Sequence, residues 1–342
     1  MSWLLKVAIF VAAYLYVYVE LFAGQKWKEM LFFFHSIEID FSRGFLLLVV
    51  LLLMPINWSI ETFKWQFSLR PIARVNFRTA LKSVLTGVAI GSFTPWRIGD
   101  MVGRAFSLRN IKAKYALLLS IVCNLSQLFS TTFWGLLSGC FFITVLPLPT
   151  MLNYPHTLNH LFVTLSIVLV ALSAFCYLRL PFWTKTLENT LKRWWSNVSS
   201  YRELLKRFRS WDLGKLCLMS LVRHVVFTSQ FAFLLYLFNL RLPFLHSFMM
   251  INLIYFIMAA IPSFALADLG IRGSVSLFTF STYLNIQGID IPHASWIIFT
   301  SSTLIWIINL LLPAIFGSFF IFRLHFFHQK NNQNSNSSLP SL

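Results

Sequence analysis

Hydrophobic and polar positions fall in long blocks along this chain, not in the short alternation of strands or of amphipathic surface helices. About 20 consecutive apolar residues are needed for a helix to cross a bilayer. Blocks of that length predict transmembrane helices at 2–22, 44–66, 115–146, 158–180, 215–237, 244–262, 266–285 and 294–322. The pattern therefore predicts an all-α polytopic membrane protein with about eight transmembrane helices.

A further apolar run, at 80–96, does not fit a simple crossing. Basic segments lie on both sides of it, at 68–82 and 104–114, so one crossing would place a basic cluster on each side of the membrane. We expect a re-entrant hairpin that turns near 91–96, where Gly and Pro end helices. Irregular backbone at membrane depth is tolerated only inside protein or along a wet cavity, so the turn should face a cavity.

The blocks also predict the domain organisation. From Gln329 onward the chain is rich in Asn and Ser, which predicts a disordered tail at 329–342. The rest, 1–328, reads as a single integral membrane domain. It divides into halves at 1–150 and 158–322, around a basic cytoplasmic loop at 181–214.

Composition and charge agree with a membrane protein. The chain is 57% hydrophobic and 11% charged, whereas soluble domains carry about 25% charged residues. Its net charge of +17 comes from Lys and Arg between the apolar blocks, where they orient helices and contact anionic lipid, so we expect membrane lipids and not nucleic acid as partners. The loop 181–214 is strongly basic and 147–157 has no Lys or Arg, which predicts a cytoplasmic (inner) membrane protein with both termini cytoplasmic.

The charged stretch that follows the predicted hairpin is the first candidate site. Arg97, Asp100 and Arg104 lie next to apolar runs, and a charge at membrane depth costs about 2.5–3.5 kcal/mol even on lenient scales. Arginine binds phosphate through charge-assisted, often bidentate hydrogen bonds, which suggests a lipid head group as ligand. The alternative is a structural role, in which each Asp neutralises the Arg four residues later.

A second stretch resembles the first. The Ser-Phe and Gly of 92–99 recur at 263–270, an offset of 171 residues, and Asp268 and Arg272 repeat the acid-to-arginine spacing. This short identity either is a coincidence or marks an inverted repeat, which in many transporters builds a shared site near the bilayer midplane. In an inverted repeat, 251–279 would be a second hairpin that opens from the other side, in place of two full spans.

Five other intramembrane polar residues are secondary candidates. Glu61 and Lys64 lie one turn apart near a helix end, and an interfacial, snorkelling pair is preferred over a site. Arg223 and His224 lie deeper. His224 either couples transport to protons or, as we prefer, is a hydrogen-bonded packing residue. Asn124 either lines a cavity or binds a neighbouring helix.

At these residues the chain resembles the lysylphosphatidylglycerol synthase transmembrane region family. The stretch GSFTPWRIGDMVGRAFSL at 91–108 is similar to the first signature of that family, and IPSFALADLGIRGSVSL at 261–277 is similar to the second. Asn57, Lys64 and Trp65 fit a helix end that precedes the first signature. The resemblance covers most of 45–320.

The resemblance implies a multi-helix domain that moves lipids across the bilayer. In two-domain members it flips an aminoacylated phosphatidylglycerol that an appended cytosolic domain makes, and we expect that synthase activity to be absent from this chain. Three positions depart from the family pattern: Gly273 replaces a common Glu, Ala267-Asp268 a pair of glycines, and 123–125 an acidic-arginine pair. These departures leave the head group open.

The sequence therefore favours a lipid flippase over an enzyme, and we expect no cofactor or metal. We find no nucleophile elbow, P-loop, zinc-binding helix or dinucleotide fingerprint. One alternative is a membrane glycosyltransferase acting on a lipid-linked sugar, in which Asp100, Asp268 and His224 would supply acid/base chemistry. The other is a non-catalytic envelope scaffold.

Overall fold

The computed structural model describes residues 11, 15–19, 40–108, 111–145, 157–183, 198–261 and 265–321. The described part contains helices and no strand. Five helical runs are long and apolar enough to cross a membrane: α3 (Phe41–Leu69), α6 (Ala113–Val145), α8 (Thr157–Leu178), α11 (Ser210–Leu237), and α14 (Ala294–Trp306) continued by η3 (Ile307–Leu311) and α15 (Leu312–Ile321). They confirm five of the predicted spans. Most of the first predicted span, 2–22, and all of the tail at 329–342 lie outside the described residues.

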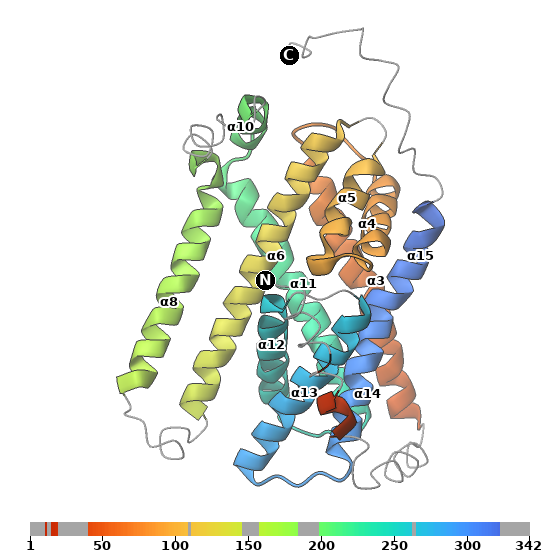
Figure 1. Ribbon diagram of the computed structural model, residues 1–342, viewed down its shortest axis with the longest axis vertical. Coiled ribbons are helices and arrows are strands. Elements are labelled where there is room, and N and C mark those ends of the chain that lie inside the picture. Colours follow the sequence, from red (N-terminus) through yellow and green to blue (C-terminus); the bar gives the residue numbers. More distant parts are fainter. Residues whose placement is uncertain are drawn as a thin grey trace.

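The run at 80–96 forms the expected hairpin (Figure 1). Its first arm is α4 (Phe77–Gly91), and its second consists of the short η2 (Pro95–Arg97) and α5 (Ile98–Phe106). The Asn76 side chain accepts a hydrogen bond from Thr79 N–H and so caps the start of α4. Pro95 opens η2, where the missing N–H costs nothing. The turn therefore lies within the predicted 91–96.

Glycines let the two arms of this hairpin touch. Gly87 and Gly91 on α4 face Gly99 and Gly103 on α5, with the four-residue spacing that permits close helix contact. A Cβ built on Gly103 would lie 2.7 Å from Gly87 Cα, which is too close for any side chain. The hairpin thus depends on backbone-to-backbone packing.

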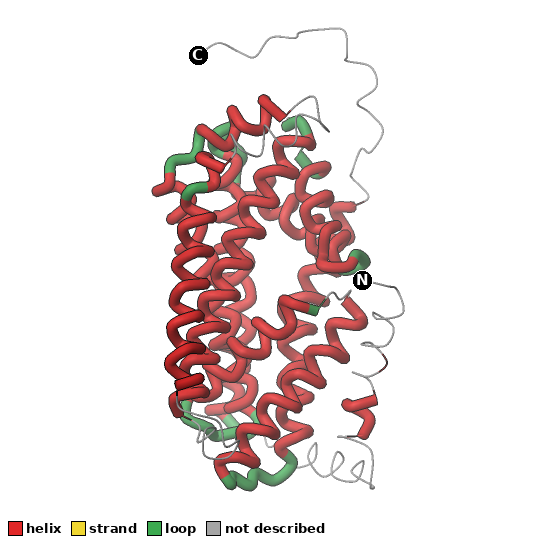
Figure 2. Tube along the Cα trace, turned by 60° about the vertical axis from the view of Figure 1, so that its left-hand side comes forward, coloured by secondary structure: helices red, strands yellow, loops and turns green. Residues whose placement is uncertain are grey.

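A second hairpin consists of α12 (Phe244–Ala260) and α13 (Ala265–Gln287). This arrangement favours the hairpin alternative over two full spans at 244–262 and 266–285. Helix α12 has only 17 residues, about 25 Å at 1.5 Å per residue. The backbone N–H of Ala265, at the start of α13, donates to the Ser92 carbonyl oxygen of the first hairpin at 3.0 Å. The two hairpins therefore come from opposite ends of the bundle and meet in its middle (Figures 1 and 2).

The long helices around the hairpins follow the same pseudo-symmetry. Helix α3 precedes the first hairpin, α11 precedes the second, and the two helices pack side by side in opposite directions (Figure 1). Helix α4 packs on α15, and α12 packs on α6, so each hairpin contacts the long helix that follows the other one. This is the arrangement expected of an inverted repeat. Ser263, part of the sequence echo, lies outside the described residues.

A chain of amide side chains crosses the middle of the bundle. Asn57 Nδ2 donates to Asn309 Oδ1 at 3.1 Å, Asn309 Nδ2 donates to Gln230 Oε1 at 2.7 Å, and Gln230 Nε2 donates to the Val50 carbonyl at 2.6 Å. Asn309 lies in the π-helical turn η3, an irregularity frequent at functional positions in helices. These hydrogen bonds tie α3, α11 and η3 together.

Hydrophobic contacts join the two halves of the chain. Two clusters of buried apolar residues form the core, and each contains residues from before 150 and after 158. Helix α8 lies at the edge of this core: only Ser166 and Tyr177 are buried along it, and Tyr177 belongs to one of the two clusters. The described basic stretches, including the short α10 (Val198–Lys206), gather at one end of the bundle (Figure 1).

Candidate functional site

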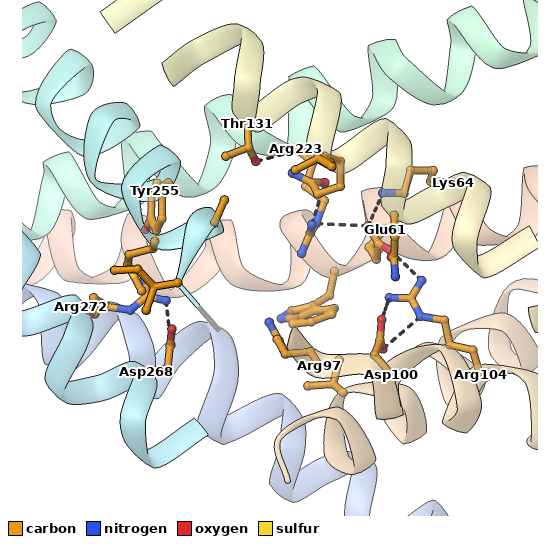
Figure 3. A pocket seen from close by; sticks show the side chains of 18 residues that line it. Glu61, Lys64, Arg97, Asp100, Arg104, Thr131, Arg223, Tyr255, Asp268 and Arg272 are labelled. Carbon is orange, nitrogen blue, oxygen red and sulfur yellow. Dashed lines mark hydrogen bonds and ion pairs between the residues drawn. The ribbon is translucent and has the colours of Figure 1, made fainter. Parts of the chain in front are cut away.

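A cavity of about 380 Å³ lies between the two hairpins and the long helices, and is called the central cavity below. Eight charged side chains line it (Figure 3): Glu61, Lys64, Arg97, Asp100, Arg104, Arg223, Asp268 and Arg272. Its polar and aromatic lining includes Trp58, Asn124, Gln127, Thr131 and Tyr255. The cavity thus collects side chains from both hairpins and from α3, α6 and α11.

Glu61 is the centre of one charge cluster. Its Oε1 lies 2.7 Å from Arg104 Nη1, and its Oε2 lies 2.8 Å from Lys64 Nζ and 3.4 Å from Arg223 Nε. The residue is only 2% exposed. A single carboxylate therefore links α3, α5 and α11, and a buried charge with such partners is costly to remove.

Arg104 is held by two carboxylates at once. Besides Glu61, it grips Asp100 through two parallel contacts, Nη2 to Oδ2 at 2.9 Å and Nε to Oδ1 at 3.1 Å. The bidentate geometry is the strong form of an arginine–carboxylate pair. Asp100 and Arg104 line the cavity, with their hydrogen-bonding groups largely engaged by protein.

Arg97 differs from the other cationic residues. Its backbone lies in the left-handed region with φ 56°, which is uncommon for a residue other than glycine. The side chain is exposed and makes no ion pair within the described part of the chain. Figure 3 shows it at the edge of the cavity, between the two charge clusters. The hairpin turn thus presents a cation that forms no ion pair with a carboxylate of the described residues.

The second hairpin contributes its own ion pair. Arg272 Nη2 lies 3.0 Å from Asp268 Oδ2, the acid-to-arginine spacing found in the sequence, and the guanidinium carbon is 5.4 Å from the centre of the Tyr255 ring. Arg223 closes the cavity from α11. It donates from Nη1 to Gln127 Oε1 at 3.0 Å and stands 5.5 Å from the centre of the Trp58 ring.

The structure brings nine of the ten candidate residues into one lining: Glu61, Lys64, Arg97, Asp100, Asn124, Arg104, Arg223, Asp268 and Arg272. The remaining candidate, His224, is buried behind it, and its Nε2 pairs with Asn252 Oδ1 at 2.8 Å. This contact agrees with the preferred interpretation as a packing histidine.

The preferred interpretation of Glu61 and Lys64 as an interfacial pair was wrong. Lys64 is 1% exposed, and its Nζ reaches Ser220 Oγ at 3.3 Å instead of the membrane surface. The physical reason is the first hairpin, which covers this part of α3 and supplies Arg104 to Glu61. A hydropathy pattern places a residue by depth along its helix and does not show what covers it.

Sequence reasoning missed Trp58, Thr131 and Tyr255, which also line the cavity. The chain is 17% aromatic, so single aromatic residues carry no signal of their own. The spacing of Trp58 was the available clue, since it lies three residues before Glu61 on the same helix face.

The charges of the lining do not cancel. Five cationic side chains meet three carboxylates among the described residues, which leaves a formal surplus of two positive charges. All three carboxylates are already paired with Lys or Arg. Within the described part of the chain, no group of three His, Cys, Asp or Glu side chains could hold a metal ion. The arrangement favours an anionic ligand.

Comparison with known proteins identifies the family. The family model for the lysylphosphatidylglycerol synthase TM region matches residues 3–290, a range that contains every residue of the central cavity named above. No curated protein matches the chain.

Proposed function

The chain belongs to the lysylphosphatidylglycerol synthase TM region family, and on that premise we propose that it moves phospholipids with anionic head groups between the leaflets of a bilayer. Membership makes it a multi-pass membrane protein of a lipid-related family. Translocation, the anionic head group and the roles of individual residues are the proposal.

The observation that carries this proposal is a positively charged cavity between two half-crossing hairpins. A lipid that changes leaflets needs a polar route for its head group while its tails remain in hydrocarbon. The hairpins enter from opposite ends of the bundle and meet in its middle (Figure 2), so that charged residues of both line the central cavity. Arg97, exposed and without an ion-pair partner in the described residues, provides the group that meets a phosphate.

The orientation in the membrane follows from the distribution of charge. The basic ends of α3–α4 and α5–α6, and α10, all lie at the end of the bundle where the first hairpin opens (Figure 1). Positively charged loops remain on the cytoplasmic side. We propose that this end faces the cytoplasm and that the second hairpin opens from the outer side of a cytoplasmic membrane.

Reconstitution into vesicles tests the proposal. Phosphatidylglycerol with a fluorescent label on one acyl chain is placed in both leaflets, and dithionite quenches only the label that reaches the outer leaflet. We expect the protein to accelerate quenching of the inner pool and Arg97→Gln to slow it about tenfold, the value of one charged hydrogen bond. Arg78→Gln is the matched control, because Arg78 is an exposed arginine on the same hairpin outside the cavity lining.

Two results would overturn this function. One is a rate of quenching no faster than in protein-free vesicles of the same lipid. The other is transfer of sugar from a nucleotide or polyprenyl donor to a lipid by the purified protein, which would favour the membrane glycosyltransferase.

A further inference from the structure

The charge balance of the central cavity points to a narrower class of ligand. We propose that the preferred head group is a phosphate monoester, as in phosphatidate or a polyprenyl phosphate, and not a phosphodiester or an aminoacylated head group. The inference rests on the proposed function, since it names the head group that the same cavity accepts.

The carboxylates of the cavity are not free to receive a cationic amine. Asp100 is held in a bidentate pair by Arg104, and Asp268 is paired with Arg272 at 3.0 Å. Glu61 is shared among three cations. An aminoacylated head group would bring at least one further positive charge into a lining that already has a surplus of them. That lining disfavours such a head group.

The surplus positive charge has two distinct sources. Around Glu61 and Asp100, three cations (Lys64, Arg104 and Arg223) face two carboxylates, which leaves one positive charge. Arg97, which none of these carboxylates contacts, is the other. On the second hairpin, Arg272 and Asp268 form an ion pair with no net charge.

Of the four cationic residues that produce the surplus, Arg97 and Arg223 are the two whose guanidinium groups are accessible to a ligand. Lys64 and Arg104 are nearly fully buried and engaged by carboxylates, whereas Arg223 touches Glu61 only at 3.4 Å and retains 16% of its side-chain exposure. Figure 3 shows Arg223 coming from α11 and Arg97 from the first hairpin toward the same space. Their like charges interact, and an anion between them would turn this repulsion into two attractions.

A phosphate monoester matches these two charges in number and in geometry. It carries about −1.5 to −2 near pH 7 and has three terminal oxygens, so it can accept from two guanidinium forks. A phosphodiester carries a single charge and has two free oxygens. It would leave one cation uncompensated, and an uncompensated charge within a membrane protein is expensive.

Vesicles that contain tail-labelled phosphatidate or tail-labelled phosphatidylglycerol with the same acyl chains test the inference. The rate of quenching is measured near pH 8 and near pH 5, on either side of the second pKa of a phosphate monoester at about 6. Rates are corrected for protein-free vesicles. Near pH 8 we expect phosphatidate to move about tenfold faster than phosphatidylglycerol. Near pH 5 the difference should vanish, because both lipids then carry about one charge.

The phosphodiester lipid controls for titration of the protein itself. The charged groups that line the cavity come from α3, both hairpins and α11, and His224 lies behind Arg223 on α11. A change in their protonation would alter both lipids alike, whereas titration of the head group alters phosphatidate alone. Arg97→Gln removes one of the two surplus charges and should abolish the preference, Arg97→Lys should retain part of it, and Arg78→Gln should leave it unchanged.

The outcomes distinguish a failure of the monoester assignment from a failure of the proposed lipid translocation. Equal rates for the two lipids near pH 8, or a preference that persists near pH 5, would overturn the monoester assignment while phosphatidylglycerol movement still supports translocation. A faster rate for lysyl-phosphatidylglycerol than for phosphatidate would overturn it in the same way. Failure of every lipid to move would overturn translocation itself.

Discussion

Replacement of Glu61 by glutamine should destabilise the protein more than any other single loss of charge in the cavity. Glutamine keeps the shape of the side chain but carries a neutral amide. Its oxygen can still accept from Arg104, while its NH₂ group faces the donors of Lys64 and Arg223, which already lie 2.8 Å and 3.4 Å from Glu61 Oε2. The variant therefore places the amide NH₂ next to other hydrogen-bond donors. It also raises the formal surplus of positive charge around position 61 from one to two.

The magnitude follows from the burial of the cluster. Glu61 and Lys64 are 2% and 1% exposed, so solvent screens their interaction very little. Removal of one partner of a buried pair costs about 3–5 kcal/mol, mainly because the remaining charge is left uncompensated. We expect Glu61→Gln to lower the free energy of unfolding by about that amount.

Reversible unfolding in detergent micelles, followed by circular dichroism, measures this difference. Glu203→Gln is the matched control, because Glu203 is an exposed glutamate on α10 and should change stability by no more than about 0.5 kcal/mol. Addition of Lys64→Met to Glu61→Gln should recover part of the loss, since it removes one of the orphaned cations. A loss below about 1 kcal/mol for Glu61→Gln, or no coupling in the double-mutant cycle, would refute the reasoning.

Two further predictions concern the hairpins. Gly103→Ala should cost at least about 1–3 kcal/mol in the same unfolding assay, because its Cβ would meet the backbone of α4, whereas Gly214→Ala, with open space at the Cβ position, should be neutral or stabilising. Cysteines introduced at Ser92 and Ala265, after replacement of the four native cysteines, should permit a reducible cross-link between the tips that stops lipid movement until reductant is added. Unimpaired transport in the cross-linked protein would show that the tips need not separate.

The hydrophobic pattern was sufficient for the elements it describes directly. Helices α3, α6, α8, α11 and α14–α15 lie where long apolar blocks predicted them, because a bilayer requires a minimum apolar length whatever the neighbours. The first hairpin was predictable for a different reason: its flanking charges cannot lie on opposite sides of the membrane, and Gly and Pro mark its turn. The second hairpin stayed an alternative because the only sequence observation that pointed to it was the short repeat of the first hairpin.

The sequence identified the candidate residues by their charge and position along the chain, but it did not show which of them contact one another. Charge at membrane depth singled out Arg97, Asp100 and Arg104, and the repeat singled out Asp268 and Arg272. Helical spacing reveals pairs four residues apart on the same helix, and both such pairs form. Neither helical spacing nor the repeat links Glu61 with Arg223, which lies far along the chain and 3.4 Å away in the structure.

The sequence by itself determined that this chain is helical, embedded in a membrane, charged near its middle and a relative of a lipid-related family, because each property follows from local composition or from motifs. Only the tertiary structure decided that Glu61, from a helix expected to present it near the interface, binds Arg104 and Arg223 at the centre of the bundle. It also decided that Arg97 is the cation left without a carboxylate in the described lining. The physical reason is that neutralisation depends on distances between side chains from different helices, which are set by packing and not by sequence spacing.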